Sequence, residues 1–411
     1  MFDKMKLQMK AGMAFRGAGA GLFAPDRIDE AIALYDEIRK VDPVFKLDSH
    51  TWLLSRYDDA KAVLRDTRFS NNDGSDVSDA EDDQGYHTLT RSMLYLDPPD
   101  HTRLRRLVQQ AFQPRHINQL EGAIEEAVDG LLDAAVPKGH MDLMAELAHP
   151  LPVWVICTML DVPLEDRDEI QALAVDSALL LDYEFLDEAT RERGLKNSLT
   201  LRAYFDDLID KRRANPGDDI MSGLITAETD GQRLTQDELV SMADLLFVAG
   251  HETTVNLIGN GTRAMLDHPG SLERLAAEPD LVPSAVEECL RYTPSVTLNG
   301  RIASEELTIA DKTVEKGSYI IIPTDAVNRD PLRFPDPHRF DIARADNAHL
   351  TFSIGPHICL GASLARLEAK VAWRKLLARV QDIQATAPSP WRPHVNLRGL
   401  ESLNVSFRAA S

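Results

Sequence analysis

The sequence Phe352-Ser353-Ile354-Gly355-Pro356-His357-Ile358-Cys359-Leu360-Gly361 places one cysteine in a loop rich in turn-forming residues. The apolar residues that follow recur at helical spacing, at Leu360, Leu364, Leu367 and Val371. Cys359 is therefore expected at or just before the N-terminus of a helix. The helix dipole and the unpaired backbone N–H groups at such a position favour a thiolate over a thiol.

Other residues of this loop suit a flat ligand that is held by sulfur. Gly355 and Gly361 permit backbone conformations, or a close approach of a ligand, that a side chain would block. Phe352 is expected to pin the loop to the core. A thiolate with one open face suits haem iron, to which it pushes electron density. The alternative is a buried structural cysteine after a turn, which is the commoner fate of a lone cysteine.

The complete pattern Phe-x-x-Gly-x-His-x-Cys-x-Gly resembles the haem loop of the cytochrome P-450 family, in which glycine is common where this chain has Ser353. The resemblance implies a mainly α fold with a smaller β-rich region. It places haem b between a long central helix and the helix that follows the cysteine loop. It also implies that Cys359 ligates the iron and that Phe352 and Gly361 lie beside the cofactor.

Composition narrows the class of protein. The chain has 411 residues, a length at which one large or two modest domains are expected. Its formal net charge is −21, so nucleic acid is not an expected partner. The three cysteines lie far apart, without zinc spacing, which fits a reducing cytosol. No stretch approaches the ~20 apolar residues of a membrane span. We therefore expect a cytoplasmic monomer without a membrane span.

The chain is expected to divide into a mobile segment, residues 1–25, and a single haem-thiolate domain, residues 26–411. The β-rich part is predicted mainly at about 40–70 and 295–325, together with a C-terminal hairpin. Residues 71–86 read as an acidic loop without periodicity. That loop is either solvated or the mobile entrance of a pocket.

A long helix is predicted from the capping box Thr235-x-x-Glu238 to about Asp267, where Pro269 and Gly270 stop it. Its apolar middle contains Gly250, Glu252 and Thr253, which are costly there unless paired or used. Either the helix bends with threonine bonded back to its own backbone, or it opens a groove for dioxygen and water. Residues 249–254 resemble the acid–alcohol motif of the family, which implies that Glu252 relays protons and that Thr253 assists dioxygen cleavage.

Basic side chains recur where the resemblance requires them. His101 and Arg105 are four residues apart on a predicted helix and share one face. Alone they are an ordinary basic helix start, but the resemblance places both on the haem propionates, together with Arg301 and His357. The chemistry is suitable, because two carboxylates need cationic or N–H donors and arginine can bind in a bidentate manner.

Glu288 and Arg291 stand at i, i+3 on another predicted helix. Alone they are a commonplace surface ion pair. The resemblance implies a buried pair that is met by a second arginine, for which Arg339 is the candidate. The implied role is structural, because this group holds the loop that carries the cysteine.

The resemblance implies a monooxygenase that inserts one oxygen atom of O2 into a C–H bond of an apolar small molecule. We expect no attached flavin or iron–sulfur module, so that electrons come from NAD(P)H through a separate ferredoxin reductase and ferredoxin. Ferredoxin is predicted to dock on Arg103, Arg106, Arg115 and Lys370. The alternatives are a peroxide-dependent haem-thiolate enzyme and a non-catalytic haem ligand sensor. The retained Glu252 and Thr253 argue against both.

The substrate is the least determined part of this hypothesis. The apolar residues 172–186 either pack in the core or cover the pocket. The candidate pocket residues are apolar and fit a terpenoid, steroid, fatty acid or aromatic substrate without choosing among them. They are Leu180, Leu245, Val248, Ala249, Val296, Thr297, Leu298 and Leu400.

Overall fold

The structure is a computed structural model that describes Leu7, Ala11 and residues 24–72, 92–110, 112, 114–217, 219–229 and 231–410. The side chains at positions 114–116 and 184 are outside this description. Nearly all of the predicted mobile segment 1–25 and most of the predicted acidic loop 71–86 therefore lie outside the described residues. The same holds for the side chain of Arg115.

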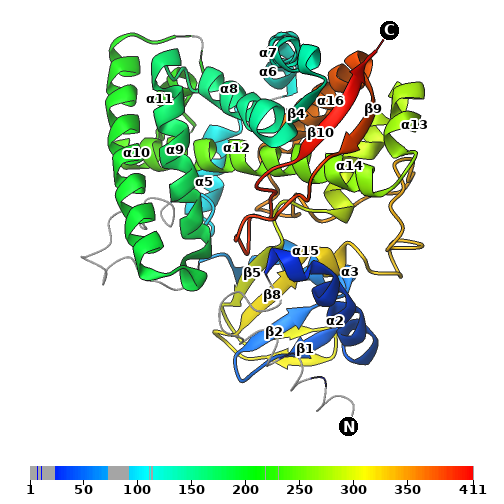
Figure 1. The fold of residues 1–411 in the computed structure, drawn as a ribbon. Helices are drawn as coiled ribbons and strands as arrows, with labels where there is room; N and C mark the ends of the chain where they lie inside the picture. Colours follow the sequence, from blue (N-terminus) through cyan, green and yellow to red (C-terminus); the bar gives the residue numbers. More distant parts are fainter. Residues whose placement is uncertain are drawn as a thin grey trace.

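Most of the described chain is helical and is arranged around one long helix, α12 (Gln236–Asp267), which crosses the molecule in Figure 1. The other α-helices are α2 (Ile28–Val41), α3 (Tyr57–Arg65), α5 (Asp100–Val108), α6 (Pro114–Gln119), α7 (Glu121–Ala135), α8 (Pro150–Met159), α9 (Arg167–Ala178), α10 (Glu188–Ala214), α11 (Ile220–Thr226), α13 (Ser271–Ala277), α14 (Val282–Tyr292), α15 (Thr324–Val327) and α16 (Ala362–Arg379). Shorter helical turns are η2 (Pro25–Arg27), η3 (Val136–Lys138), η4 (Met144–Ala148), η5 (Leu164–Asp166), η6 (Leu179–Phe185) and η7 (Pro279–Leu281). None of the described helices combines the length and the apolar composition that a membrane span requires.

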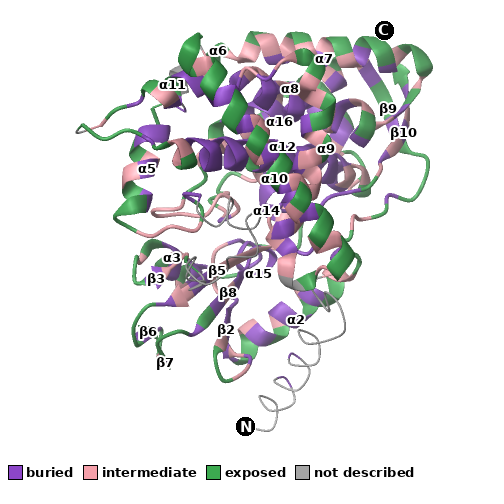
Figure 2. Ribbon diagram, turned by 90° about the vertical axis from the view of Figure 1, so that its left-hand side faces the viewer, coloured by how far each residue is buried: buried purple, intermediate pink, exposed green. Residues whose placement is uncertain are grey.

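The N-terminus of α12 is fixed by the predicted capping box. Thr235 Oγ1 accepts the backbone N–H of Glu238 at 3.3 Å, and the Glu238 carboxylate accepts the N–H of Thr235 at 2.8 Å. Two of the donors that a helix start leaves unpaired are thereby satisfied. Most residues of α12 are buried, because α8, α9, α10, α14 and α16 pack around it. Figure 2 shows this burial along the interior of the molecule.

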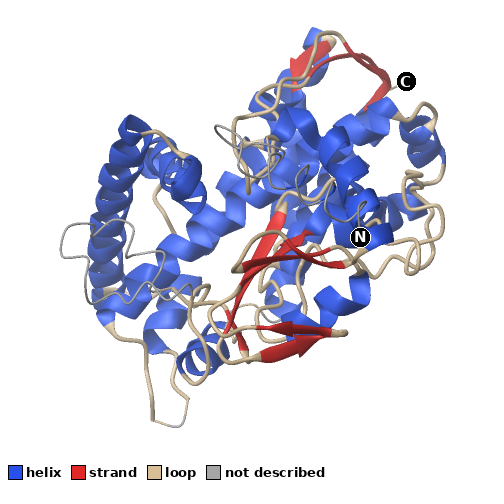
Figure 3. Ribbon diagram, turned by 90° about the horizontal axis from the view of Figure 1, so that it is seen from below, coloured by secondary structure: helices blue, strands red, loops and turns tan. Residues whose placement is uncertain are grey.

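The strands form three separate sheets. They are β1 (Val44–Lys46), β2 (Thr51–Leu54), β3 (Phe69–Ser70), β4 (His140–Asp142), β5 (Leu298–Ala303), β6 (Leu307–Ile309), β7 (Lys312–Val314), β8 (Tyr319–Pro323), β9 (Val380–Ala385) and β10 (Asn404–Ala409). The largest sheet has the order β1-β2-β8-β5-β3, in which only β2 and β8 are parallel. β4, β10 and β9 form an antiparallel sheet near the C-terminus, away from the largest sheet, and β6 pairs with β7 (Figure 3).

Alternation along the strands gives the largest sheet two apolar faces. Trp52 and Ile320 belong to the core that also contains residues of α3, whereas Leu53 packs with residues of α2 on the opposite face. This is the period of two expected of strands that are covered on both sides. The prediction of a mainly α fold with a smaller β-rich region is confirmed.

One close crossing positions the helix that follows the cysteine loop. A Cβ at Gly261 of α12 would lie 2.6 Å from the ring of Trp373 of α16, so only glycine fits there without a shift. Trp373 also donates its indole N–H to Thr262 Oγ1 at 3.0 Å. These contacts hold α16 against the central helix, deep in the core.

Asp244 makes the stability of α12 depend on pH. It is wholly buried, and neither carboxylate oxygen has a hydrogen-bond partner. Burial raises the pKa of Asp244 to about 7, although Arg202 opposes the shift. The pKa of Asp244 in the folded protein lies above its usual value of 3.8. The contribution of Asp244 to the free energy of unfolding is therefore fully present below pH 3.8 and is lost as the pH rises through 7.

We therefore expect Asp244→Asn to stabilise the protein at pH 8 by up to about 4 kcal/mol, since each pKa unit corresponds to about 1.4 kcal/mol. At pH 4 the effect should be small. Urea unfolding at the two pH values measures the difference. Asp267→Asn is the matched control on the same helix, because Asp267 is half-exposed in an ion pair with Arg263. An equal gain at both pH values would contradict the prediction.

Candidate active site

The cysteine loop is closed by its own backbone. The N–H of Cys359 donates to the carbonyl oxygen of Phe352 at 2.8 Å, and Gly361 stands at the N-terminal cap of α16. Gly355 has φ +80°, and a Cβ there would lie 2.6 Å from the carbonyl oxygen of Leu64. Ser353 has φ +57°, a left-handed conformation that favours glycine and so accounts for the glycine common at this position.

Arg366 holds the loop from outside, through one contact with an aromatic ring and one with a carboxylate. The guanidinium of Arg366 lies 4.5 Å from the centre of the Phe352 ring. Arg366 also donates to both oxygens of Glu287 on α14, at 2.6 and 2.8 Å. The Phe352 ring therefore packs against the core and beneath Arg366 of α16, in line with its expected role of pinning the loop.

Cys359 is the accessible one of the three cysteines, whereas Cys157 and Cys289 are buried. Burial raises the pKa of the Cys359 thiol above its usual value, and the N–H of Gly361 and the guanidinium of Arg105 offset only part of that shift. The sulfur is thus surrounded by protein and yet retains accessible surface. At Cys157 burial raises the pKa to about 12, with only weak opposition. The helix N-terminus therefore provides Cys359 with thiolate-stabilising donors.

A cluster of basic side chains lies near Cys359. The rings of His101 and His357 are 4.0 Å apart, and neither ring nitrogen of the buried His101 has a hydrogen-bond partner. Burial, His101 and both Arg301 and Arg105 lower the pKa of His357 to about 3. Within the described part of the chain, none of these four side chains forms an ion pair with a carboxylate. Such a self-repelling, unpaired cluster suits a ligand that carries carboxylate groups.

The middle of α12 is the second component of the site. Ala249 is exposed and Thr253 half-buried, although the residues from 239 to 248 are buried, so neighbouring elements do not fully cover this face of the helix. Thr253 Oγ1 donates to the carbonyl oxygen of Ala249 at 2.8 Å. The helix is continuous here, and the threonine has the back-bonded geometry of the first interpretation given above. Whether Thr253 also assists dioxygen cleavage stays a prediction.

Glu252, next to Thr253, is only 2% exposed and forms an ion pair with Arg392. Burial alone raises the pKa of Glu252, but basic side chains around it, Arg392 foremost, lower it further than burial raises it, so its net pKa is below the usual range. Glu252 is therefore an ionised carboxylate inside the protein. A buried charge of this kind is stable only when it is paired.

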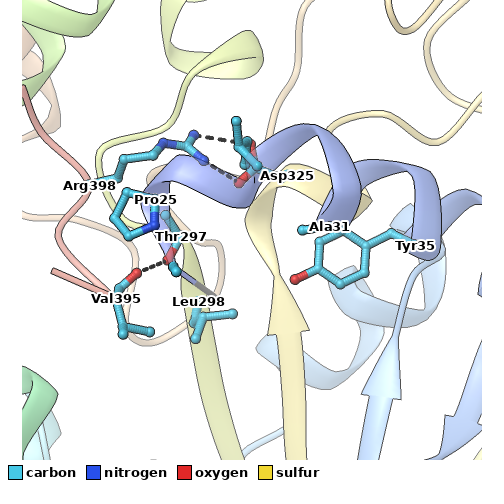
Figure 4. Close-up of a pocket in the computed structure, with 10 residues that line it drawn as sticks. Pro25, Ala31, Tyr35, Thr297, Leu298, Asp325, Val395 and Arg398 are labelled. Carbon is cyan, nitrogen blue, oxygen red and sulfur yellow. Dashed lines mark hydrogen bonds and ion pairs between the residues drawn. The ribbon is translucent and has the colours of Figure 1, made fainter. Parts of the chain in front are cut away.

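The predicted pocket residues fall into two groups. Ala249, Val296, Thr297 and Leu298 retain accessible surface, whereas Leu180, Leu245, Val248 and Leu400 are buried. A small hollow lies beside Thr297 and Leu298, between the start of α2 and the C-terminal loop, which we define as residues 391–400. Figure 4 shows its wall, where Arg398 pairs with Asp325 and Thr297 bonds to Val395.

The segment predicted to cover the pocket is tied to that C-terminal loop. Asp182 of η6 is 5% exposed and accepts the backbone N–H groups of Val395 at 2.7 Å and Asn396 at 2.9 Å. The loop is also pinned to the strand start, because Thr297 Oγ1 donates to the carbonyl oxygen of Val395 at 2.6 Å. Residues that are distant in sequence therefore meet at this loop.

Residues 34–381 match the sequence profile of the family described as Cytochrome P450. The chain belongs to the cytochrome P450 family. The polyketide biosynthesis cytochrome P450 PksS of Bacillus subtilis (strain 168) is 42% identical over 368 residues, which cover 87% of this chain and 89% of the relative. Vitamin D(3) 25-hydroxylase of Pseudonocardia autotrophica is 42% identical over 381 residues, which cover 91% and 93%.

A solved structure agrees with this assignment. The crystal structure of P450BioI in complex with an acyl carrier protein ligated with hexadec-9Z-enoic acid superposes with a TM-score of 0.88 at 36% identity. The similarity covers 93% of this chain and 100% of that chain. The P450 described here is accordingly an oxidoreductase of the monooxygenase type, and its cofactor is haem b.

The residues of this P450 fit that cofactor. Cys359 offers an accessible sulfur at a helix N-terminus, and His101 offers two buried ring nitrogens without partners. With Arg105, Arg301 and His357 they form a set of one sulfur and several cationic or N–H donors. This donor set matches what an iron porphyrin needs.

One predicted site residue is corrected by the structure. Arg291 and Glu288 are both fully buried and form a bidentate pair at 2.8 Å, but the second arginine is Arg344, whose Nε lies 3.1 Å from Glu288. Arg339 contributes only its backbone carbonyl to Arg291, and its side chain is 68% exposed beside Asp341. The prediction of Arg339 is therefore wrong, because Arg339 closes the turn that begins at Asp336 and its side chain lies in solvent.

The predicted ferredoxin surface is less basic than its sequence suggests. Arg103 pairs with Glu238, the capping residue of α12, and Lys370 pairs with Glu121 at 2.7 Å. Arg106 is exposed on α5. Docking of ferredoxin on these residues stays a prediction.

Proposed function

We propose that this P450 hydroxylates an unactivated C–H bond of an apolar small molecule, with electrons delivered by a separate ferredoxin and its reductase in the cytoplasm. When bound, haem supplies the redox centre at which dioxygen is cleaved. The observation that carries the proposal is the accessible Cys359 sulfur, stabilised by the N–H of Gly361 at the start of α16. We further propose that residues 26–411 act as one catalytic unit.

The protein's own residues have distinct proposed roles. Cys359 holds the iron, and His101, Arg105, Arg301 and His357 hold the propionates. Glu252 moves protons toward Thr253, because it is an ionised carboxylate and directly precedes Thr253 in the sequence of α12. General acid–base transfer of this kind contributes about 10²–10⁴-fold in rate.

The walls of the site support an apolar substrate. Ala249, Val296 and Leu298 present apolar accessible surface, and Thr297 adds one hydroxyl whose hydrogen bond is already made to Val395. Relatives named for polyketide biosynthesis and for vitamin D(3) hydroxylation, and a structure with a fatty acyl chain, point to large apolar molecules. We therefore propose a polyketide, steroid or fatty acyl substrate rather than a small polar metabolite.

Reconstitution with a ferredoxin, its reductase and NAD(P)H tests this proposal. A panel of polyketide, steroid and fatty acid compounds is first screened for a spin-state shift of the haem spectrum, and those that bind are then turned over. We expect oxygen uptake coupled to a hydroxylated product, and about 10²-fold or greater loss of coupled turnover in Glu252→Gln.

Two other outcomes would refute the proposal. Product formed only with added peroxide, and unchanged in Glu252→Gln, would identify a peroxide-dependent enzyme. Ligand binding without any product, with either electron source, would identify a haem sensor. His338→Gln serves as the control variant, because His338 is half-exposed and pairs with Asp36 in a different part of the chain.

A further inference from the structure

In the middle of α12, two adjacent side chains bring polar atoms toward each other without a hydrogen bond. His251 Nε2 lies 3.7 Å from Glu252 Oε2, and neither atom has a hydrogen-bond partner. His251 is wholly buried and Glu252 is 2% exposed. Buried polar atoms are nearly always paired, so two that face each other unpaired call for an explanation.

The other ring nitrogen of His251 fixes the tautomer. Nδ1 lies 2.8 Å from the carbonyl oxygen of Phe247, one helical turn earlier. A carbonyl oxygen only accepts, so Nδ1 carries the hydrogen and Nε2 of the neutral ring presents its lone pair. A nitrogen lone pair and a carboxylate oxygen are therefore opposed inside the protein.

Arg392 distinguishes the two oxygens of Glu252. Its guanidinium pairs with Oε1 and also donates to Asn256 Oδ1 at 2.6 Å. Gly399 makes room for this arrangement, because a Cβ there would overlap the Asn256 amide oxygen. Oε1 is thus engaged by the C-terminal loop, and Oε2 is the oxygen that remains available for a proton.

The surroundings set how many protons the pair can hold. The charged and titratable groups that face it are Arg392 and His394 from the C-terminal loop and His149 from the junction of η4 and α8. With a neutral His251, Arg392 and Glu252 cancel. One added proton gives the cluster a single positive charge, and a second would place two positive charges in the interior, which is strongly disfavoured.

A single added proton gives both unpaired atoms, His251 Nε2 and Glu252 Oε2, a hydrogen-bond partner. Leaving a buried acceptor unpaired costs about 1–3 kcal/mol. A proton on Nε2 or on Oε2 converts the opposed acceptors into a donor and an acceptor, after a small side-chain movement that shortens the 3.7 Å separation. The protonation of His251 therefore depends on that of Glu252, and the two titrate as a pair.

We propose that His251 and Glu252, the two residues before Thr253 in α12, form a holding site for one proton. The inference rests on the proton-moving role proposed for Glu252 above. A proton that arrives as hydronium bonds to Nε2 of His251 and releases water. It passes to Oε2 of Glu252, so that Nε2 regains its lone pair, and is then given to a water molecule that carries it toward Thr253. Only N–H and O–H bonds form and break, and no electron is transferred. His149, which is half-buried at the helix junction, marks the side from which water supplies the proton.

His251 acts through Glu252, so it is a positioning residue for proton delivery. The informative variant is His251→Asn, whose amide N–H can still donate to the Phe247 carbonyl while the Nε2 position is deleted. The chain also contains a matched control. His268, on the residue after α12, has Nδ1 2.7 Å from the carbonyl oxygen of Ala264, the same i to i−4 contact.

His268 differs from His251 in that aromatic rings, and no carboxylate, surround its ring within the described part of the chain. Its ring packs on Tyr292 and Phe340, with ring centres 5.5 and 4.7 Å away. Within the described part of the chain, no carboxylate lies within ion-pairing distance of His268. His268→Asn therefore makes the same chemical change in a similar backbone setting without a carboxylate opposite.

The first measurement does not depend on turnover. Ring-¹⁵N NMR of the diamagnetic ferrous–CO holoenzyme, titrated from about pH 5 to pH 9, follows each histidine through its usual range. We expect one resonance that His251→Asn removes and whose midpoint Glu252→Gln shifts, while His268→Asn leaves it unchanged. A His251 resonance whose midpoint is the same in Glu252→Gln would overturn the inference.

The second measurement is coupled turnover in ¹H2O and ²H2O. We expect His251→Asn to lower product formed per NAD(P)H by roughly tenfold, less than the loss of a direct proton donor. Hydrogen peroxide release and the solvent isotope effect should both rise, with substrate binding unchanged. Wild-type coupling in His251→Asn would also overturn the inference. If no compound is turned over at all, the proposed function fails, whereas the NMR titration still decides the proton site.

Discussion

Cys359→His is expected to abolish NAD(P)H-driven hydroxylation while haem remains bound. The physical reason is that a thiolate ligand pushes electron density to iron and favours cleavage of the O–O bond, which a neutral imidazole does not do. The reduced protein with CO should lose the red-shifted Soret band that marks thiolate ligation. Absorbance spectra and coupled oxygen uptake measure the two effects.

Haem should stay bound in this variant because the protein holds it at more than one point. His101, Arg105, Arg301 and His357 form an unpaired basic cluster, which would bind two propionates without help from sulfur. Haem content per chain should therefore change little, whereas turnover falls to background.

Cys157→Ala is the matched control for this experiment. It also removes a thiol, but from the interior of α8, where burial raises the pKa of Cys157 to about 12. The control should keep the thiolate band and measurable turnover. A red-shifted band that persists in Cys359→His would show that another side chain ligates iron, and the assignment of the site would fail.

The contrast between these two cysteines illustrates what local sequence predicts well. Glycines, a proline and an apolar helical repeat follow each other around Cys359, and each acts on its immediate neighbours. The same is true of the capping box, in which Thr235 and Glu238 satisfy each other's backbone N–H groups. Features that depend on a few consecutive residues are therefore found where the sequence places them.

Pairings between distant residues carry no such signal. Arg392 meets Asn256 across 136 residues, and Asp182 meets Val395 across 213. The residues near Glu252 in sequence do not predict that an arginine from the C-terminal loop will form an ion pair with it. One sequence feature near Arg392 is consistent with the contact, because the missing side chain of Gly399 leaves room for Arg392 and Asn256.

Apolar pattern likewise fails to separate a pocket wall from the core. Leu400 is wholly buried and lies opposite Trp391, whereas Ala249 in the middle of a buried helix is exposed. Both are apolar residues in apolar surroundings of the sequence. Accessibility depends on which side faces a hollow, and that depends on packing of the whole molecule.

Arg344 presents a similar problem at shorter range. Arg339 and Arg344 are five residues apart in a turn-rich segment, and either could reach Glu288 from its sequence position. Asp336, just before them, has φ +47°, so the chain turns sharply there. The outcome is that Arg344 donates to Glu288 and to three backbone carbonyl oxygens, while the Arg339 side chain is 68% exposed.

This buried group also reaches the cysteine loop. Arg291 Nη1 donates to the carbonyl oxygen of Asn328 at 3.0 Å, and the Asn328 amide donates to Thr351 Oγ1 at 2.9 Å. Asn328 Oδ1 in turn accepts the N–H of Leu350 at 2.9 Å. A chain of hydrogen bonds therefore connects α14 to the residues that precede Phe352.

Arg291→Ala is accordingly expected to cost about 3–5 kcal/mol of unfolding free energy, the usual cost of breaking a buried ion pair. It removes a bidentate partner of the fully buried Glu288 and leaves the carbonyl oxygens of Asn328, Pro337 and Arg339 without that donor. Urea unfolding of the holoprotein measures the loss. Arg291→Lys should not restore it, because lysine lacks the fork that reaches these oxygens together.

Arg339→Ala is the comparison that tests the correction made by the structure. Its effect should be within about 0.5 kcal/mol, as for most exposed side chains. The loss of unfolding free energy in Arg344→Ala should fall between those in Arg339→Ala and Arg291→Ala, because Arg344→Ala leaves the Glu288–Arg291 pair intact. If Arg291→Ala does not fold, Arg344→Ala still provides the comparison with Arg339→Ala. A loss in Arg339→Ala that matched or exceeded that in Arg344→Ala would mean that Arg339, and not Arg344, completes the buried group. The cysteine loop would then be anchored through the turn at Asp336 and not through the helix α14.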